Sequence, residues 1–179
     1  GSAIDDYIKN IENVSGSTVK DIITGDANKN TLLGNAGNDT LDGGAESDYI
    51  DGGADNDQIT GGAGADNLFG GSGDDIFIGT TFTGDVINGD SGTSNIGLAD
   101  TVDYSLLSGS NGIKVTLNGS TVANVTINSS VDHTIVNIEN VYGSNNADSI
   151  LGDGLNNILI GNAGIDDIDG GAGDDNISG

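Results

Sequence analysis

The chain has 179 residues, and its 28 acidic residues outnumber its 4 Lys and Arg residues so strongly that the formal net charge at pH 7 is −24. Such a charge excludes polyanionic partners, so we expect binding neither to nucleic acid nor to an anionic membrane. Apolar residues form 34% of the chain, cysteine is absent, and no apolar run has the length of a membrane span, which excludes a thick core, disulfide bonds and a transmembrane segment.

The first fifteen residues precede any repeat. Gly1 and Ser2 are typical of an expression scar, and the residues after them are predicted to form a lead-in or capping strand, so 1–15 is assigned to these two elements. At the other end, Gly179 falls on the first position of a repeat, which predicts that the chain is a piece of a longer protein.

Residues 16–78 form a first array of seven nonapeptides, among them GGAGADNLF and GGSGDDIFI. Residues 143–179 form a second array with four more. Position 1 is Gly in all eleven nonapeptides, position 6 is Asp in nine and Asn in two, and position 8 is a large apolar residue in all eleven. This register predicts a repeat protein.

Residues 79–142, between the arrays, break the register and are predicted to form a β spacer or capping segment. Residues 113–117 and 122–127 alternate as strands do, with a turn at Asn118-Gly119, and 135–141 is predicted as one further strand. Structural continuity between the arrays is the favoured role of this spacer, and contact with a sugar or a receptor is the alternative.

A longer repeat lies over the nonapeptides. Residues 8–52 align without a gap with residues 135–179, sharing 26 of 45 residues, and the lead-in sequence Asn-Ile-Glu-Asn-Val occurs in both. The nonapeptide pattern GGxGxDxUx, in which U is a large apolar residue, resembles the RTX (repeats-in-toxin) family. The block of lead-in and array resembles the RTX blocks of adenylate cyclase toxins and of large secreted bacterial adhesins.

The nonapeptide itself predicts a coil. Three residues around position 8 can form a short strand with one inward apolar side chain, and the glycine-rich residues before it can turn because glycine adopts positive φ. Two such turns complete one coil of eighteen residues, and coils stack at the strand spacing of ~4.8 Å. We therefore expect an all-β fold, in which two right-handed parallel β-roll segments of GGxGxDxUx nonapeptides, a β-helix-like solenoid, are joined by the β spacer.

Stacked coils place every second position 6 side chain in one column. Neighbouring carboxylates ~5 Å apart repel each other, whereas a cation between them lies ~2.4 Å from an oxygen of each, which is a Ca–O bond length. The resemblance implies the same arrangement, with several Ca²⁺ ions bound. The predicted metal ligands are Asp21, Asp39, Asp57 and Asp75 at one edge of the first roll, Asn30, Asp48 and Asp66 at the other edge, and Asp148, Asn157, Asp166 and Asp175 in the second roll.

The predicted sites differ in strength. Sites between the fully acidic pairs of regular repeats are expected to be strongest, and the pair Asp148/Asp166 is expected to be good. Asp21 is expected to be weaker because the repeat 16–24 lacks glycine at its second and fourth positions. Sites with Asn30 or Asn157 are expected to be weakest because each lacks one carboxylate charge.

The sequence predicts that the chain is not an enzyme. The single histidine, His133, has no nucleophile motif beside it, so a packing or surface role is favoured. Glu12 and Glu139 occupy the same place in the two lead-in sequences and are expected to fix a turn or the edge of a metal column. Tyr104 and Tyr142 are expected to pack rather than to bind a ligand.

The expected function is that of a calcium-binding RTX module that folds on binding Ca²⁺ after secretion. It is expected to act as a structural spacer of a larger secreted bacterial protein, outside the cell or on its surface. The resemblance implies export by the type 1 secretion machinery, so the expected partners are calcium ions, this machinery and the rest of the host polypeptide. The alternative is a module that binds a polysaccharide or a cell-surface receptor in an adhesin, a toxin or a polysaccharide-modifying enzyme.

Overall fold

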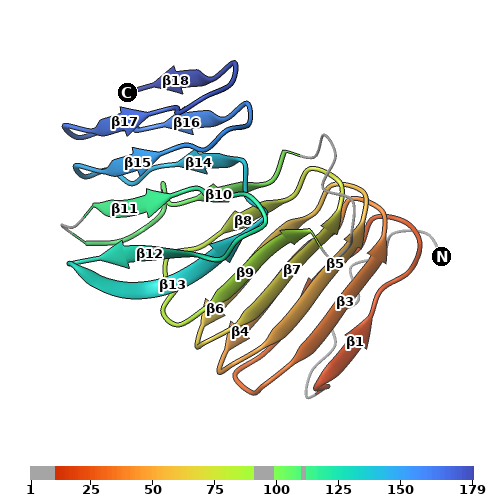
Figure 1. The fold of residues 1–179 in the computed structure, drawn as a ribbon. Coiled ribbons are helices and arrows are strands. Elements are labelled where there is room, and N and C mark those ends of the chain that lie inside the picture. The colour runs from red at the N-terminus through yellow and green to blue at the C-terminus, as the bar shows by residue number, and fades with distance from the viewer. Residues whose placement is uncertain (1–10, 91–98, 110–111) are drawn as a thin grey trace.

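The computed structural model describes residues 11–90, 99–109 and 112–179, and every regular element in these ranges is a β-strand. The expected expression scar lies outside the described residues, as does most of the predicted lead-in segment. The strands form two sheets that face each other across a thin interior (Figure 1). The described residues include no helix that is long and apolar enough to cross a membrane.

The two sheets differ in their number of strands. The larger sheet has ten, in the spatial order β1 (Asn13–Ser15), β3 (Thr31–Ala36), β5 (Tyr49–Ala54), β7 (Asn67–Ser72), β9 (Val86–Asp90), β13 (Ser130–Val136), β12 (Ala123–Ile127), β11 (Ile113–Thr116), β15 (Ser149–Leu151) and β17 (Asp167–Asp169). The smaller sheet has eight, in the order β18 (Asn176–Ser178), β16 (Ile158–Ile160), β14 (Asn140–Tyr142), β10 (Thr101–Asp103), β8 (Ile76–Ile78), β6 (Gln58–Ala63), β4 (Thr40–Ala45) and β2 (Ile22–Thr24).

The register confirms the predicted parallel β-roll with eighteen residues per coil. Leu32 pairs with Ile50, and Ile50 with Leu68, each eighteen residues apart in parallel strands of the ten-stranded sheet. Position 8 side chains from Ile23 to Phe77 are buried, as the predicted apolar ladder requires. Because one such side chain per strand fills the interior, the core is a narrow column of apolar residues between the sheets.

Glycine at positions 2 and 4 of the regular repeats has a conformational reason. Gly53 at position 2 has φ 107° and Gly64 at position 4 has φ 149°, a region that side chains disfavour. Asp55 occupies position 4 of its repeat with φ 73°, so it adopts the same turn at some conformational cost. The GGxG pattern is therefore the sequence signature of this turn.

The spacer continues both sheets between the two rolls. In the eight-stranded sheet β10 pairs in parallel with β8 and with β14, and in the ten-stranded sheet β13 pairs in parallel with β9 while β11 pairs with β15. The prediction of one strand over 135–141 is wrong. The chain turns at Asn137, which has φ 53°, so Ile135 lies in one sheet and Val141 in the other.

A cluster of rings fills the interior where the rolls meet. Phe82 packs edge-on against Tyr104 with ring centroids 5.2 Å apart, and His133 lies 5.2 Å from Phe82 and 5.5 Å from Tyr104. The Tyr104 hydroxyl is 2.7 Å from Nε2 of His133, and Nδ1 of His133 is 3.1 Å from a carboxylate oxygen of Asp132. Tyr104 and His133 are both buried, so the structure gives each of them a packing role.

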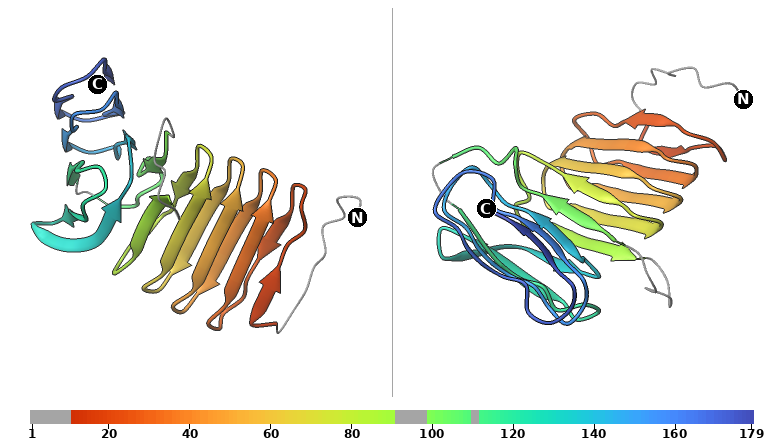
Figure 2. Two further views of the ribbon diagram at one scale, coloured as in Figure 1. Left: turned by 45° about the vertical axis from the view of Figure 1, so that its right-hand side comes forward. Right: turned by 90° about the horizontal axis from the view of Figure 1, so that it is seen from above.

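Two strands of the ten-stranded sheet have no counterpart in the other sheet. The coil that contains β13 and β14 is followed along the chain by the coil of β15 and β16, yet β12 and β11 lie between β13 and β15. These two strands pair antiparallel with each other, and β12 also pairs antiparallel with β13. One side of the solenoid is thus longer than the other, and the second roll is inclined to the first (Figure 2).

The two sequence blocks are half a coil out of phase. The lead-in residues of β1 align with those of β14, but β1 lies in the ten-stranded sheet and β14 in the eight-stranded sheet. If one strand and the turn before it count as half a coil, the spacer between the blocks therefore contributes an odd number of half coils.

Candidate metal sites

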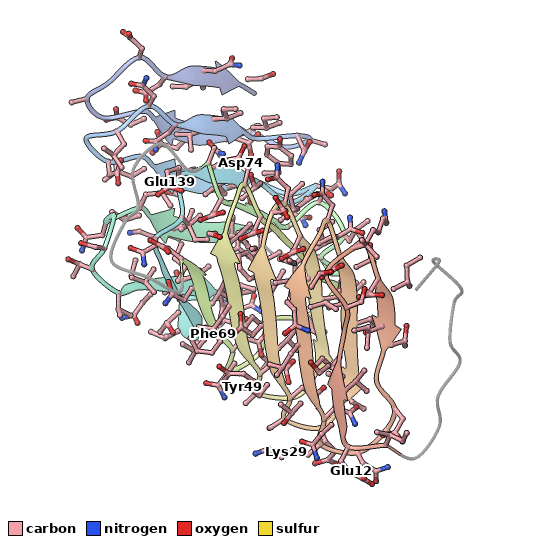
Figure 3. The ribbon with its side chains drawn as sticks, turned by 90° about the vertical axis from the view of Figure 1, so that its right-hand side faces the viewer. Glu12, Lys29, Tyr49, Phe69, Asp74 and Glu139 are labelled. Carbon is pink, nitrogen blue, oxygen red and sulfur yellow. The ribbon has the colours of Figure 1, made fainter. Side chains whose placement is uncertain are left out.

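The turns of the solenoid lie along two opposite edges. We call edge A the turns that lead into the ten-stranded sheet and edge B the turns that lead into the eight-stranded sheet. Figure 3 shows Glu12 and Lys29 at edge A and Asp74 and Glu139 at edge B. Because position 6 directly precedes each strand, its side chains are sorted into one column per edge.

Hydrogen bonds connect successive members of each column. The N–H of Asp39 donates to Oδ1 of Asp57 at 2.7 Å, and the N–H of Asp57 donates to Oδ1 of Asp75 at 2.8 Å. At edge A the N–H of Asp48 donates to Oδ1 of Asp66 at 2.8 Å. Each bond joins residues eighteen apart, so these position 6 residues stack with the period of two nonapeptides.

The second carboxylate oxygen of these residues is buried without a hydrogen-bond partner. This holds for Oδ2 of Asp39, Asp48, Asp57, Asp66, Asp75, Asp85 and Asp100. A buried acceptor without a partner costs about 1–3 kcal/mol, and more when it is charged. Seven such oxygens in regular rows indicate a ligand that these atoms bind.

The unpartnered oxygens converge with main-chain carbonyl oxygens. A Cβ added at Gly52 would come closer than 3.0 Å to both Oδ2 of Asp57 and the carbonyl oxygen of Gly70. The same holds at Gly43 for Oδ2 of Asp48 and the carbonyl oxygen of Gly61. The position 1 glycine therefore leaves open a small cradle of oxygen atoms, which explains why no other residue occurs there.

Burial disfavours the charged carboxylates in the columns. Desolvation raises the pKa of Asp57 to about 7, and the nearby carboxylates of Asp75 and Asp39 add to this rise. Desolvation likewise raises the pKa of Asp48 to about 6 and that of Asp75 to about 6. A cation in the cradle would reverse this balance, because it stabilises the charged form of each neighbouring carboxylate.

The donor set identifies the type of cation. The cradles offer oxygen atoms only, from carboxylates and carbonyls, which are the ligands of hard cations such as Ca²⁺. Across 11–90, 99–109 and 112–179, no group of three or more His, Cys, Asp or Glu side chains lies close enough to hold a metal ion together. Main-chain carbonyls must therefore supply much of the coordination, as the flexible shell of six to eight oxygens around Ca²⁺ permits.

A second kind of turn occurs in the less regular repeats. The N–H of the position 2 residue donates to the position 6 side chain: Ser17 to Asp21, Asp26 to Asn30, Ser144 to Asp148 and Asp153 to Asn157. In these turns a main-chain N–H therefore donates to the side-chain oxygen of position 6 that has no hydrogen-bond partner in the regular repeats. Asp148 belongs to this group, and its N–H also donates to Oδ1 of Asp166 at 3.0 Å, so these two residues are stacked as a pair. Asp166 and Asp175 follow Gly161 and Gly170, where a Cβ would meet their Oδ2 atoms.

Sequence reasoning missed two members of the columns, Asp85 and Asp100. The N–H of Asp66 donates to Oδ1 of Asp85 at 2.9 Å, and the N–H of Asp75 donates to Oδ1 of Asp100 at 2.8 Å. Their separations of 19 and 25 residues break the period of eighteen. The detectable signal is an Asp two residues before a buried apolar residue, here Ile87 and Val102.

The fold and the oxygen cradles define a calcium-binding parallel β-roll. A family profile described as RTX calcium-binding nonapeptide repeat (4 copies) matches residues 15–50, 24–59, 42–77 and 151–179, which together are just over half of the chain. The chain therefore belongs to the RTX calcium-binding nonapeptide repeat family, as the sequence predicted. A comparison with curated proteins found no match.

Proposed function

We propose that the columns are the calcium ligands and that Ca²⁺ binding drives folding of this module. The observation that carries the proposal is the row of buried, unpartnered Oδ2 atoms facing carbonyl oxygens. The proposed ligands at edge B are Asp21, Asp39, Asp57 and Asp75 in the first roll and Asn157 and Asp175 in the second. Those at edge A are Asn30, Asp48 and Asp66 in the first roll and Asp148 and Asp166 in the second.

The charge distribution couples binding to folding. A net charge of −24 is spread over a chain whose rolls bury only one large apolar side chain per strand, so the folded state without cations concentrates repulsion that little burial offsets. The sites do not exist in the unfolded chain, and the binding free energy therefore stabilises the fold directly. With a Kd of ~10⁻⁴–10⁻³ M, which is typical of extracellular modules, the chain would fold in extracellular calcium and stay unfolded in the cytosol.

This dependence suits a secreted spacer. The chain would pass the type 1 secretion machinery unfolded and become a stiff rod outside the bacterium, where it separates other parts of a larger host polypeptide. Catalysis is not part of the proposal, because the paired carboxylates are assigned to calcium and the single histidine, His133, is buried among rings.

The alternative, a module that binds a polysaccharide or a receptor through its spacer, has less support. Such a site would present aromatic side chains to the ligand. Phe82 and Tyr104 of the spacer are instead buried in the ring cluster. Exposed Tyr49 and half-buried Phe69 form a ring pair with centroids 5.2 Å apart, but this pair lies on the first roll and not on the spacer (Figure 3).

Circular dichroism and small-angle X-ray scattering test the proposal together. Millimolar CaCl₂ should produce a β spectrum and a rod-like scattering profile, whereas EDTA should give an unfolded spectrum and an expanded chain. MgCl₂ at the same ionic strength is the control for charge screening. A cooperative β fold in EDTA that calcium leaves unchanged would contradict calcium-driven folding.

A further inference from the structure

We infer that the spacer contains a calcium site of its own at edge B, built from Gly89, Asp100, Asn137 and Glu139. These residues belong to no nonapeptide. The inference rests on the proposed function of the columns and extends it to the junction of the two rolls.

A regular edge-B site has four features. A Cβ at Gly52 would meet Oδ2 of Asp57 and the carbonyl oxygen of Gly70. The N–H of Asp57 donates to a carboxylate oxygen of Asp75 at 2.8 Å, and the carbonyl of Asp57 accepts from the N–H of Ile76, the residue after Asp75, at 2.9 Å. One carboxylate thus faces the cradle, and the next coil supplies a carbonyl oxygen to the cradle and a second carboxylate to the N–H of the first residue.

The junction reproduces all four features. A Cβ at Gly89 would meet Oδ2 of Asp100 and the carbonyl oxygen of Asn137. The N–H of Asp100 donates to Oε2 of Glu139 at 3.0 Å, and the carbonyl of Asp100 accepts from the N–H of Asn140, the residue after Glu139, at 2.9 Å. Asp100 is fully buried and its Oδ2 has no hydrogen-bond partner, so this oxygen is available to a cation in the cradle.

The longer side chain of Glu139 has a geometric reason. In a nonapeptide the position 1 carbonyl and the position 6 carboxylate belong to residues five apart, whereas Asn137 and Glu139 are two residues apart. This shorter turn begins at Asn137 with φ 53°. Because this turn contains fewer residues, Glu139 supplies the additional reach with one more methylene group than Asp, and its carboxylate accepts from the N–H of Asp100.

In the coil of β13 and β14, the edge-A column has a histidine instead of a carboxylate. The residue that follows Asp85 in the edge-A stack is His133, because Thr134 pairs with Val86 in the sheet. The His133 side chain is turned into the ring cluster, where it contacts Tyr104, and it has no oxygen atom to offer a cation. The edge-A column of carboxylates is therefore interrupted at the junction, whereas the edge-B column continues through it from Asp75 by way of Asp100 to Glu139. One calcium ion at edge B would connect residues that precede β11 and β12 in the chain with residues that follow them, and so fasten the coil of β13 and β14 to the coil of β9 and β10.

Equilibrium dialysis with radioactive calcium tests the site in the full chain. Glu139→Gln keeps an acceptor for the N–H of Asp100 but removes the charge, and we expect one bound ion fewer than in the unaltered chain. Asp103→Asn is the matched control, since its side chain accepts from the N–H of Ser105 outside the column and should leave the number of ions unchanged. Circular dichroism in saturating calcium verifies that both variants are folded.

A crystal structure of the unaltered chain in CaCl₂ gives a result that does not depend on folding of a variant. An ion bound to Asp100, Glu139 and the Asn137 carbonyl supports the inference. Ions in the first roll with none at this junction, or an unchanged number of ions in Glu139→Gln, overturn it while leaving the proposed function intact. Absence of calcium from the rolls themselves would instead refute the proposed function.

Discussion

Replacing Asp57 by Asn should cost more stability in calcium than replacing Asp21 by Asn. Asp57 lies in the middle of the edge-B column, where it is hydrogen-bonded to both Asp39 and Asp75 and its Oδ2 is unpartnered. Asp21 donates its N–H to Asp39 only, and its Oδ2 already accepts from the N–H of Ser17. Asp57 can therefore serve two ions, whereas Asp21 can serve at most one.

The size of the effect follows from ligand linkage. At about 10 mM calcium, an ion bound with a Kd of ~10⁻⁴–10⁻³ M stabilises the folded state by about 1.4–2.7 kcal/mol. Loss of two ions in Asp57→Asn should lower the free energy of unfolding by about 3–5 kcal/mol, and Asp21→Asn should lower it by no more than the value for one ion. Urea unfolding at fixed calcium concentration measures both, with the exposed Asp167→Asn as a control for the change of charge.

The sign of the Asp57→Asn effect in EDTA provides a sharper test. Without calcium the substitution removes a charge that is repelled by Asp75 and Asp39, so it should stabilise the fold. Trimethylamine N-oxide can populate the folded state for this measurement, since it strengthens effective burial. Destabilisation of equal size in calcium and in EDTA would show that Asp57 has a structural role only, and equal losses for Asp57→Asn and Asp21→Asn would refute the two-ion geometry.

Four other outcomes are expected. Gly52→Ala should weaken calcium binding in a titration although it removes no carboxylate, because its Cβ would enter the oxygen cradle, whereas Gly154→Ala, with no atom within 4 Å, should not. Burial raises the pKa of Asp57 to about 7 and that of Asp100 to about 8, so calcium affinity should fall as the pH is lowered below neutrality and protons compete. The same raised pKa values favour the calcium-free fold below about pH 4, the ordinary Asp value, and this stability is lost as the pH rises through about 7, so the β signal in EDTA should be larger at low pH. In a calcium-bound crystal structure the ions of the first roll should form two rows, one per edge, with a spacing of ~4.8 Å.

The regular part of the molecule could be predicted because its information is local. Each regular nonapeptide contains its own turn glycines, its position 6 carboxylate and its apolar residue, so the period of eighteen and the stacking of the position 6 residues follow from repeating this unit. The difference between the two kinds of turn is harder to predict from the sequence. Ser144 beside Asp148 gives the carboxylate an N–H partner, and only the structure shows that this occurs instead of a left-handed glycine turn.

The junction could not be predicted in this way, because its contacts join distant residues. Asp75 and Asp100 are 25 residues apart, and Asp100 and Glu139 are 39 residues apart, so no period connects them. The strand predicted over 135–141 has the right apolar spacing, but its alternation does not reveal that Asn137 directs the chain from one sheet to the other.

The two additional strands in the ten-stranded sheet determine how a series of such blocks would extend. They lengthen one face by two strand spacings of ~4.8 Å, and with the faces ~10 Å apart this corresponds to a deflection on the order of 1 radian. Because consecutive blocks are half a coil out of phase, the additional strands of the next block would lie on the opposite face and deflect the axis the other way. Successive deflections would then cancel, so a long array of blocks would form a zigzag about a straight mean axis instead of closing into an arc. The reach of such a stalk would grow in proportion to the number of blocks, although no single block is straight.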